Sequence, residues 1–110
     1  MKESGEGMLL RIFISESARY RKRPLYEQIL LRAKELGIAG GTVLRGMMGY
    51  GIHGRLHTAR LLRLSEDMPI IIEIADTQAR LEAFLPHLDE MVEEGFITME
   101  RIRVIKYTPS

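Results

Sequence analysis

Apolar and polar residues alternate with a period of two in two stretches of the chain, and two further stretches have β-compatible composition, so four β-strands are predicted. In the first stretch Leu10, Ile12 and Ile14 share one face, and in the third β-branched isoleucines follow Pro69 in series. The predicted strands cover residues 8–15, 42–48, 69–75 and 97–107.

Two further segments repeat apolar residues every three or four positions and predict helices. The first begins at Pro24, which suits the first turn of a helix, and the second begins at a cap formed by Asp76 or Thr77. Pro86 is expected to kink the second helix or to divide it in two. Each helix is expected to end at a glycine, Gly37 for the first and Gly95 for the second.

The predicted order of strand, helix, strand, loop, strand, helix and strand defines the fold class. It indicates an α+β, ferredoxin-like βαββαβ sandwich, with an antiparallel four-stranded sheet and both helices on one face. Residues 1–7 are expected to be a flexible leader, and 8–110 a single domain with a long loop over 46–66. Within the loop, 57–64 could be a returning strand or one turn of helix. The strands offer apolar residues on both faces, so a partner subunit is expected to cover the second face.

The overall composition narrows the class of function. Of the 110 residues 45% are hydrophobic and 28% charged, the balance of a globular domain, and the net charge of +1 argues against binding of nucleic acid along a phosphate backbone. No cysteine is present, which excludes disulfides and thiolate metal sites and favours a cytoplasmic location. No apolar run reaches the length of a membrane span, so membrane insertion is not expected.

The local distribution of charge gives the main functional signal. Residues 36–65 contain no acid, yet they hold seven of the ten glycines and four arginines. Glycine lets backbone N–H groups approach a ligand and arginine donates in a fork, so this segment is predicted to bind an anion. The alternative is a solvated hairpin whose arginines pair with carboxylates of a neighbouring subunit. The candidate ligand-binding residues there are Arg45, Gly46, Gly49, Gly51, Arg55, His57, Arg60 and Arg63.

Other candidate residues lie outside that segment. Tyr20 and Lys22 belong to a basic cluster that could hold a phosphate and stack on a base, or could be a solvated loop, and Arg101 and Arg103 could face a subunit cleft or bulk water. His53 and His57 are four residues apart, a spacing that would suit a metal only on a helix. No nucleophile–histidine–acid arrangement or isolated carboxylate pair is evident, so the chain is not expected to be an enzyme.

Two stretches are distinctive enough to carry a family resemblance: Thr-Val-Leu-Arg-Gly over 42–46 and His-Thr-Ala-Arg-Leu-Leu-Arg-Leu-Ser over 57–65. With these motifs the chain resembles, from Met8 to Tyr107, a prokaryotic domain-of-unknown-function family that is similar to the nitrogen-regulatory PII signalling proteins. The resemblance implies a PII-like homotrimer that binds AMP, ADP or ATP in a cleft between subunits and acts on a membrane transporter or an enzyme.

One departure from PII argues against ATP. PII proteins bind phosphates with a glycine-rich turn before the last strand, whereas residues 93–98 here contain two acids and one glycine. Two carboxylates at that position would repel a triphosphate. Two alternatives therefore remain: a trimeric metal-tolerance protein of the same fold superfamily, with His53 and His57 as ligands, and an acylphosphatase-like hydrolase.

Overall fold

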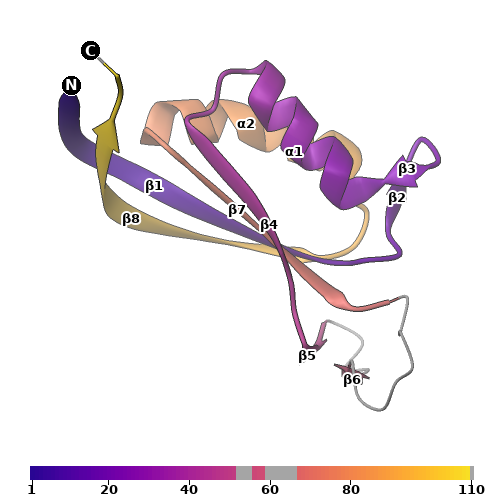
Figure 1. Ribbon diagram of the computed structural model, residues 1–110. Coiled ribbons are helices and arrows are strands. Elements are labelled where there is room, and N and C mark those ends of the chain that lie inside the picture. Colours follow the sequence, from indigo (N-terminus) through magenta and orange to yellow (C-terminus); the bar gives the residue numbers. More distant parts are fainter. Residues whose placement is uncertain (52–55, 59–66, 110) are drawn as a thin grey trace.

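The computed structural model describes residues 1–51, 56–58 and 67–109 (Figure 1). In chain order, the helices and strands are β1 (Lys2–Ser15), β2 (Arg19–Tyr20), β3 (Arg23–Pro24), α1 (Leu25–Glu35), β4 (Gly40–Arg45), β5 (Met48–Tyr50), β6 (Leu56–Thr58), β7 (Pro69–Asp76), α2 (Gln78–Met91) and β8 (Phe96–Tyr107).

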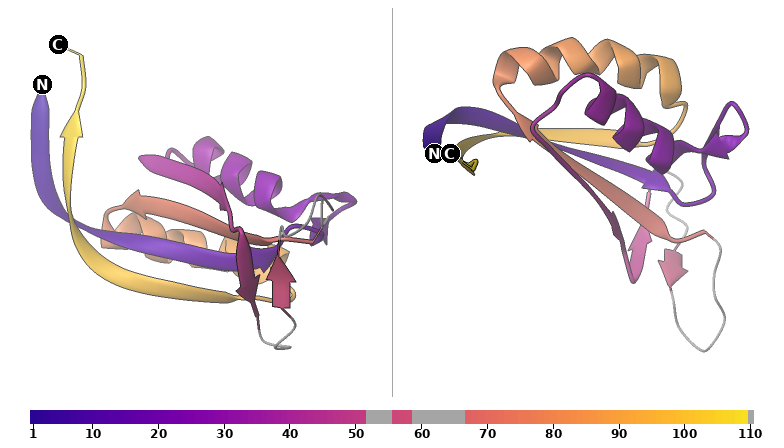
Figure 2. Two further views of the ribbon diagram at one scale, coloured as in Figure 1. Left: turned by 60° about the horizontal axis from the view of Figure 1, so that its bottom comes forward. Right: turned by 45° about the horizontal axis from the view of Figure 1, so that its top comes forward.

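The main sheet has four strands in the order β4-β7-β1-β8, and every pair in it is antiparallel. Both helices cover the same face of this sheet (Figure 2). The first and third long strands are therefore central neighbours, as the βαββαβ connection requires. The predicted ferredoxin-like fold is confirmed.

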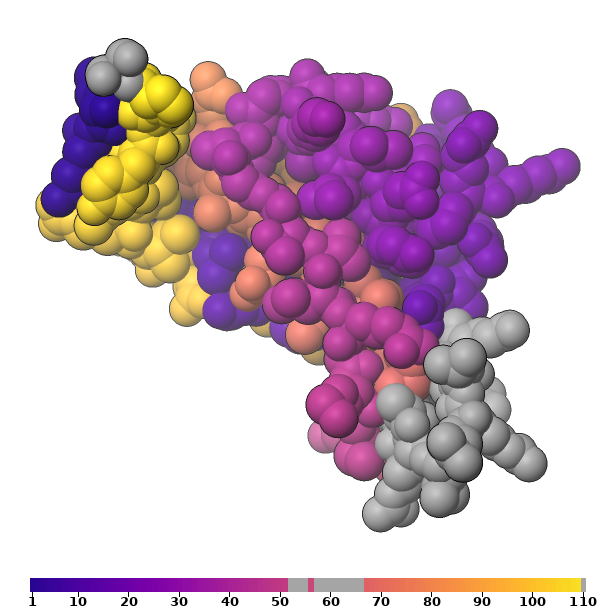
Figure 3. Space-filling view, in the orientation of Figure 1, coloured from indigo at the N-terminus to yellow at the C-terminus, as the bar shows by residue number. Residues whose placement is uncertain are grey.

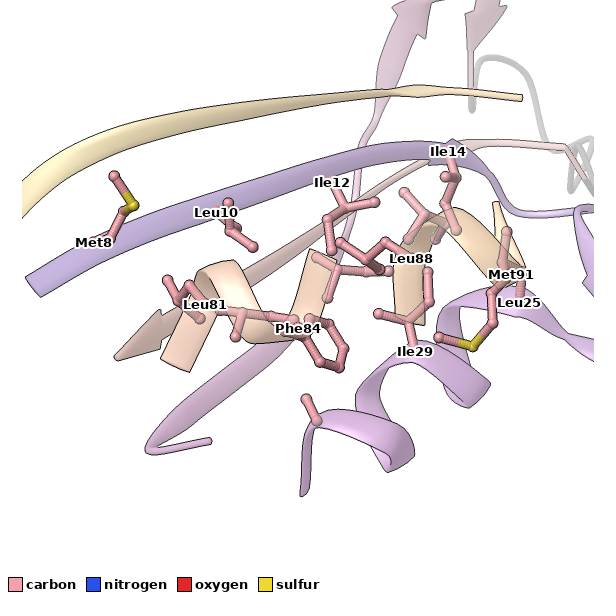
Figure 4. Packing of buried hydrophobic residues seen from close by; sticks show 14 residues of the cluster. Met8, Leu10, Ile12, Ile14, Leu25, Ile29, Leu81, Phe84, Leu88 and Met91 are labelled. Carbon is pink, nitrogen blue, oxygen red and sulfur yellow. The ribbon is translucent and has the colours of Figure 1, made fainter. Parts of the chain in front are cut away.

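The core lies between the helices and the sheet (Figure 4). Alternate residues of β1 are buried, and they face the same side as the buried isoleucines of β7, because Ile12 is directly opposite Ile72. Phe84 and Leu88 of α2 and Ile29 of α1 fill the space between these strands and the helices. Burial of this apolar surface fixes the register, since a shift by one residue would turn every buried side chain to the other face.

The helix ends follow from local chemistry. Pro24 precedes α1, and Gly37, just past its C-terminus, has the positive φ of +76° that favours glycine. Thr77 caps α2 by accepting a hydrogen bond from the backbone N–H of Arg80 at 3.3 Å. Pro86 does not divide α2, which is a single helix, and the helix ends at Met91 and not at Gly95 as expected.

The predicted leader over residues 1–7 is wrong for residues 2–7, which belong to β1. This part of β1 pairs with β8 from Lys2 opposite Tyr107 to Gly7 opposite Ile102. The two strands extend past α2 as a curved ribbon that ends at the two termini (Figure 1). The residues are too polar and glycine-rich to predict a strand by themselves, and the backbone of β8 supplies their hydrogen bonds.

The predicted long loop also differs from the structure within its described part. The expected strand over 42–48 is instead β4, ending at Arg45, followed by the separate short strand β5. β5 pairs with β6 in a small antiparallel sheet, with Gly49 opposite His57. Of the undecided segment 57–64, residues 57 and 58 are strand, and the rest lies outside the described residues.

The second face of the main sheet is not covered by either helix and combines charged and apolar side chains. Arg11 in the central strand donates to Glu73 at 2.9 Å and to Glu100 at 2.6 Å. Beside this network the rings of Phe13 and Phe96 stack with centroids 4.6 Å apart. In the described part of the chain, no helix is both long enough and apolar enough to cross a membrane.

Core packing through β1 gives a first prediction. Ile12 is 0% exposed, so Ile12→Ala is expected to lower the free energy of unfolding by about 2–5 kcal/mol through lost burial and a residual cavity. The matched control is Ile105→Ala, at a position 50% exposed on the ribbon, where less than half of that loss is expected. Chemical denaturation measures both, and equal losses would contradict the assigned core.

Candidate functional site

A groove of about 710 Å³ lies at the end of the sheet where β5 leaves β4. Gly46, Gly49 and Gly51 line one part of it, and Glu94 and Gly95, from the connection between α2 and β8, line another. These two segments are separated by more than forty residues in the sequence. The groove thus brings residues 46–51 of the predicted loop, called the glycine loop below, beside the turn that precedes the last strand.

Close backbone contacts shape this groove. The N–H of Gly46 donates to the carbonyl oxygen of Pro69 at 2.7 Å, and a Cβ on Gly46 would lie 2.8 Å from the Pro69 ring. Gly95 has a φ of +148°, and a Cβ there would lie 2.5 Å from the carbonyl oxygen of Phe13. Glycine is therefore required at both positions for the chain to turn so near its neighbours.

Among the described residues the groove lining is apolar and acidic and includes no cation. The stacked Phe13 and Phe96 contribute flat apolar surface, and Asp67 accepts hydrogen bonds from the hydroxyls of Ser15 and Ser17. Glu94 adds a second carboxylate to the lining. The flat apolar surface of the two stacked rings suits an aromatic ligand.

Arg45 is adjacent to the groove and is paired. Its Nε donates to a carboxylate oxygen of Glu16 at 3.0 Å, and Glu16 also accepts from the backbone N–H of Met68 at 3.3 Å. The absence of acids between residues 36 and 65 therefore does not leave Arg45 without a carboxylate. Glu16 reaches it from the connection after β1, which the linear sequence does not indicate.

Arg101 and Arg103 lie elsewhere. They line a second groove of about 650 Å³ together with Gly5, Gly7 and Gln78. Arg101 and Phe96 both lie on β8, where Arg101 pairs with Met8 of β1 and Phe96 pairs with Phe13. The separation of five residue positions between Arg101 and Phe96 corresponds to roughly 16 Å of extended strand, which separates the arginine from the first groove. Figure 3 shows the ribbon and the glycine loop at opposite ends of the molecule.

Tyr20 and Lys22, also expected to bind a ligand, line neither groove. They belong to the hairpin of β2 and β3, in which the phenol of Tyr20 donates to Glu90 of α2 and the guanidinium carbon of Arg21 lies 5.1 Å from the centre of the Tyr20 ring. The hydrogen bond from Tyr20, and secondly one from Arg32, lower the pKa of the Glu90 carboxyl. In this conformation Tyr20 links the hairpin to the two helices.

The hairpin turn itself is strained. Arg21 and Lys22 have φ values of +51° and +68°. A two-residue hairpin loop with positive φ at both positions is the geometry that asparagine and glycine favour. Holding other residues in this region costs about 1–3 kcal/mol each.

The remaining candidates are described in part or not at all. His57 is present as the strand residue opposite Gly49. His53, Arg55, Arg60 and Arg63 lie outside the described residues. The sequence interpretation missed Phe13, Phe96 and Asp67 as groove residues. No local signal marks them, and only the pairing of β1 with β8 would have brought the two rings together.

Comparison with known proteins identifies relatives of the whole chain. The family model described as DUF190, Uncharacterized ACR, COG1993, matches residues 7–104. A UPF0166 protein of Aquifex aeolicus is 37% identical over 97 residues, covering 88% of this chain and 91% of that protein.

Solved structures with similar folds include PII-like and other proteins. CPII of Thiomonas intermedia K12, a nitrogen-regulatory PII-like protein bound to ADP, AMP and bicarbonate, has a TM-score of 0.62 and 21% identity, covering 93% of this chain and 91% of its own. CutA1 of Oryza sativa has a TM-score of 0.57 and 12% identity, covering 94% and 84%. At these identities the likeness concerns the fold.

The Tyr20–Glu90 hydrogen bond predicts a pH-dependent stability. The pKa of Glu90 is lowered in the folded chain, so the ionised carboxyl stabilises the fold. This stabilisation is fully present above the pKa of an unfolded glutamate, about 4.3, and is lost as the pH falls through the lower pKa of the folded chain. Tyr20→Phe removes the largest cause of that shift. The variant should melt below the wild type near neutral pH.

This difference in Tm should shrink as the solution is acidified through the folded pKa. Tyr26→Phe is the control, since Tyr26 has no hydrogen-bonded carboxylate among the described residues, and it should show no such pH dependence. Thermal melts at a series of pH values measure both. A Tm difference for Tyr20→Phe that is constant with pH would contradict the assignment.

Proposed function

We propose that this chain, which belongs to the DUF190 family and has a PII-like fold, is a regulatory protein. In this proposal it binds an adenine nucleotide between two subunits. The observation that carries the proposal is the groove shared by Gly46, Gly49, Gly51 and Gly95. Its volume of about 710 Å³ lies in the range of small-molecule sites. The apolar surface near Phe13 and Phe96 would accept the base.

Among the described residues that line the groove there is no cation for the phosphates, and Arg45 lies only beside it. Arg101 and Arg103 are the candidates, but in one chain they lie at the far end of β1 and β8. A second copy whose ribbon packs beside the first groove would bring these arginines to it. In the described part of one subunit the proposed site therefore has a surface for the base but no cation in its lining for the phosphates.

The second face of the sheet is the proposed interface. Apolar side chains surround the Arg11 network there, and both helices cover the opposite face, so packing against other copies would bury surface now open to water. The closed arrangement implied by the PII resemblance is a homotrimer. In such an assembly each groove would meet the ribbon of the next subunit.

The choice of nucleotide to test follows from the comparison with a solved structure of the same fold. CPII, with the same fold, was crystallised with ADP and AMP. Those two nucleotides are the first ligands to test.

Signalling would follow from a change in the glycine loop. A phosphate near Arg45 would compete with Glu16 for the guanidinium, and loss of that pair would release the β1–β2 connection from the end of β4. A transporter or an enzyme could then bind the altered surface. No covalent step is needed for this role.

The two alternatives have no specific support among the described residues. A metal-tolerance protein would use His53 and His57, of which only the strand position of His57 is described. Titration with copper or zinc, compared between the wild type and His57→Ala, tests that role. An assay for hydrolysis of acyl phosphates tests the acylphosphatase-like alternative.

Arg45 gives the first prediction for the nucleotide site. Arg45→Ala is expected to weaken ADP binding roughly tenfold, because a charge-assisted hydrogen bond to a phosphate would be lost. The Tm should change little, since the half-exposed Arg45–Glu16 pair contributes at most about 1 kcal/mol. Isothermal titration calorimetry measures the affinity.

The matched control is Arg80→Ala. Arg80 is an exposed arginine that donates to the carbonyl oxygen of Gly37 and lines neither groove. This variant should keep wild-type affinity for ADP. Full affinity in Arg45→Ala would remove Arg45 from the site.

Mixing two variants tests whether the site is shared between subunits. Arg45→Ala retains Arg101 and Arg103, and the double variant Arg101→Ala/Arg103→Ala retains the loop. In a mixed cyclic trimer one cleft would combine the intact loop of one subunit with the intact arginines of the next. Co-refolded mixtures should therefore regain tight ADP binding at a fraction of the clefts, whereas the unmixed variants should not. Calorimetry without a tight component in the mixture would refute the shared cleft.

A further inference from the structure

The β2–β3 hairpin presents a concentrated positive charge. Of its five successive residues 19–23, four carry cationic side chains and all four are exposed. The fifth, Tyr20, is uncharged. The hairpin lies beyond the start of α1, at the opposite side of the molecule from the ribbon that carries the termini (Figure 1). The cationic residues are Arg19, Arg21, Lys22 and Arg23, and we name them the basic tip.

Three of the four cations of the basic tip have no carboxylate partner among the described residues. Among the described residues Arg19, Lys22 and Arg23 make no ion pair with a carboxylate, and Arg21 lies against the Tyr20 ring. The net charge of the chain is only +1, so this positive field is local and not a general property of the protein surface.

The backbone of the tip is held in place by contacts at its base. Tyr20 donates to Glu90, and Glu90 is also bound by Arg32 of α1 at 3.3 Å. Arg32 in turn contacts the Nδ1 of His87 in α2 at 2.8 Å. Two helices thus fix a turn whose central residues, Arg21 and Lys22, have unfavourable positive φ. Strain that is kept at an exposed basic turn indicates a function that needs those side chains there.

We propose that the basic tip docks an acidic segment of a partner protein. Three of its four cations are arginines, whose planar guanidinium groups bind carboxylates through two parallel hydrogen bonds. A fixed backbone lowers the entropy lost when such directed bonds form. Attraction to an anionic lipid surface depends on the number of cations and needs no fixed turn, so the anchored geometry favours a protein.

A role for the tip in holding the nucleotide fits the contacts less well. Arg21 lies over one face of the Tyr20 ring, the hydroxyl donates to Glu90, and the partly buried side chain packs against the hydrophobic core. The tip also lines neither groove. This inference therefore concerns a second surface, and it can fail or hold independently of the proposed function.

The test compares two double variants of the full chain for binding to poly-L-glutamate. Arg21→Asn/Lys22→Gly removes two cations of the tip and supplies residues that favour the turn, so it should bind at least tenfold more weakly and melt at a higher temperature. Lys34→Gln/Lys106→Gln is the control, because it removes the same charge from exposed positions outside the tip and should bind as the wild type does.

Three results would overturn the proposal. Equal binding by the two double variants would show that only net charge matters, and binding to phosphatidylserine vesicles without binding to poly-L-glutamate would assign the tip to a membrane. Loss of ADP affinity in Arg21→Asn/Lys22→Gly would assign it to the nucleotide site. Retained ADP affinity together with weakened poly-L-glutamate binding supports the docking surface.

Discussion

The pairing of β1 with both β7 and β8 is the constraint on which the rest of this molecule depends. Burial of alternate β1 residues beneath the helices fixes the register, and that register sets Phe13 opposite both Ile71 and Phe96. The same pairing closes one groove between two segments distant in sequence. It also extends β8 in the other direction, so that Arg103 is carried to the far end of the sheet.

The proposed division of the site between subunits would explain why the described part of one subunit has no cation in the groove lining. The groove has glycine backbone and aromatic surface, but its carboxylates come from Asp67 and Glu94. Among the described residues, Arg101 and Arg103 lie on the ribbon of the same chain, about 16 Å of strand away from this groove. The proposed assembly of copies through the open sheet face would cover apolar surface and bring these arginines to the groove of a neighbour.

The sequence was sufficient to predict the fold, because periods of two and of three to four residues report directly on burial in β1, β7 and the helices. It failed for residues 2–7, whose strand conformation depends on β8, and for the pairing of Arg45 with Glu16, which depends on the tertiary course of the chain. Of the candidate site, the glycines could be recognised locally. Phe13 and Phe96 could not, since their stacking requires the strand register. The strain at Arg21 and Lys22 had no sequence signal beyond an unusual basic run.

A crystal structure of the protein with ADP tests the central claim most directly. The account predicts that the adenine ring lies against Phe13 and Phe96 near Gly46 and Gly95, and that Arg101 or Arg103 of a neighbouring copy contacts a phosphate oxygen. ADP held entirely by residues of one chain, or bound away from this groove, would contradict the account.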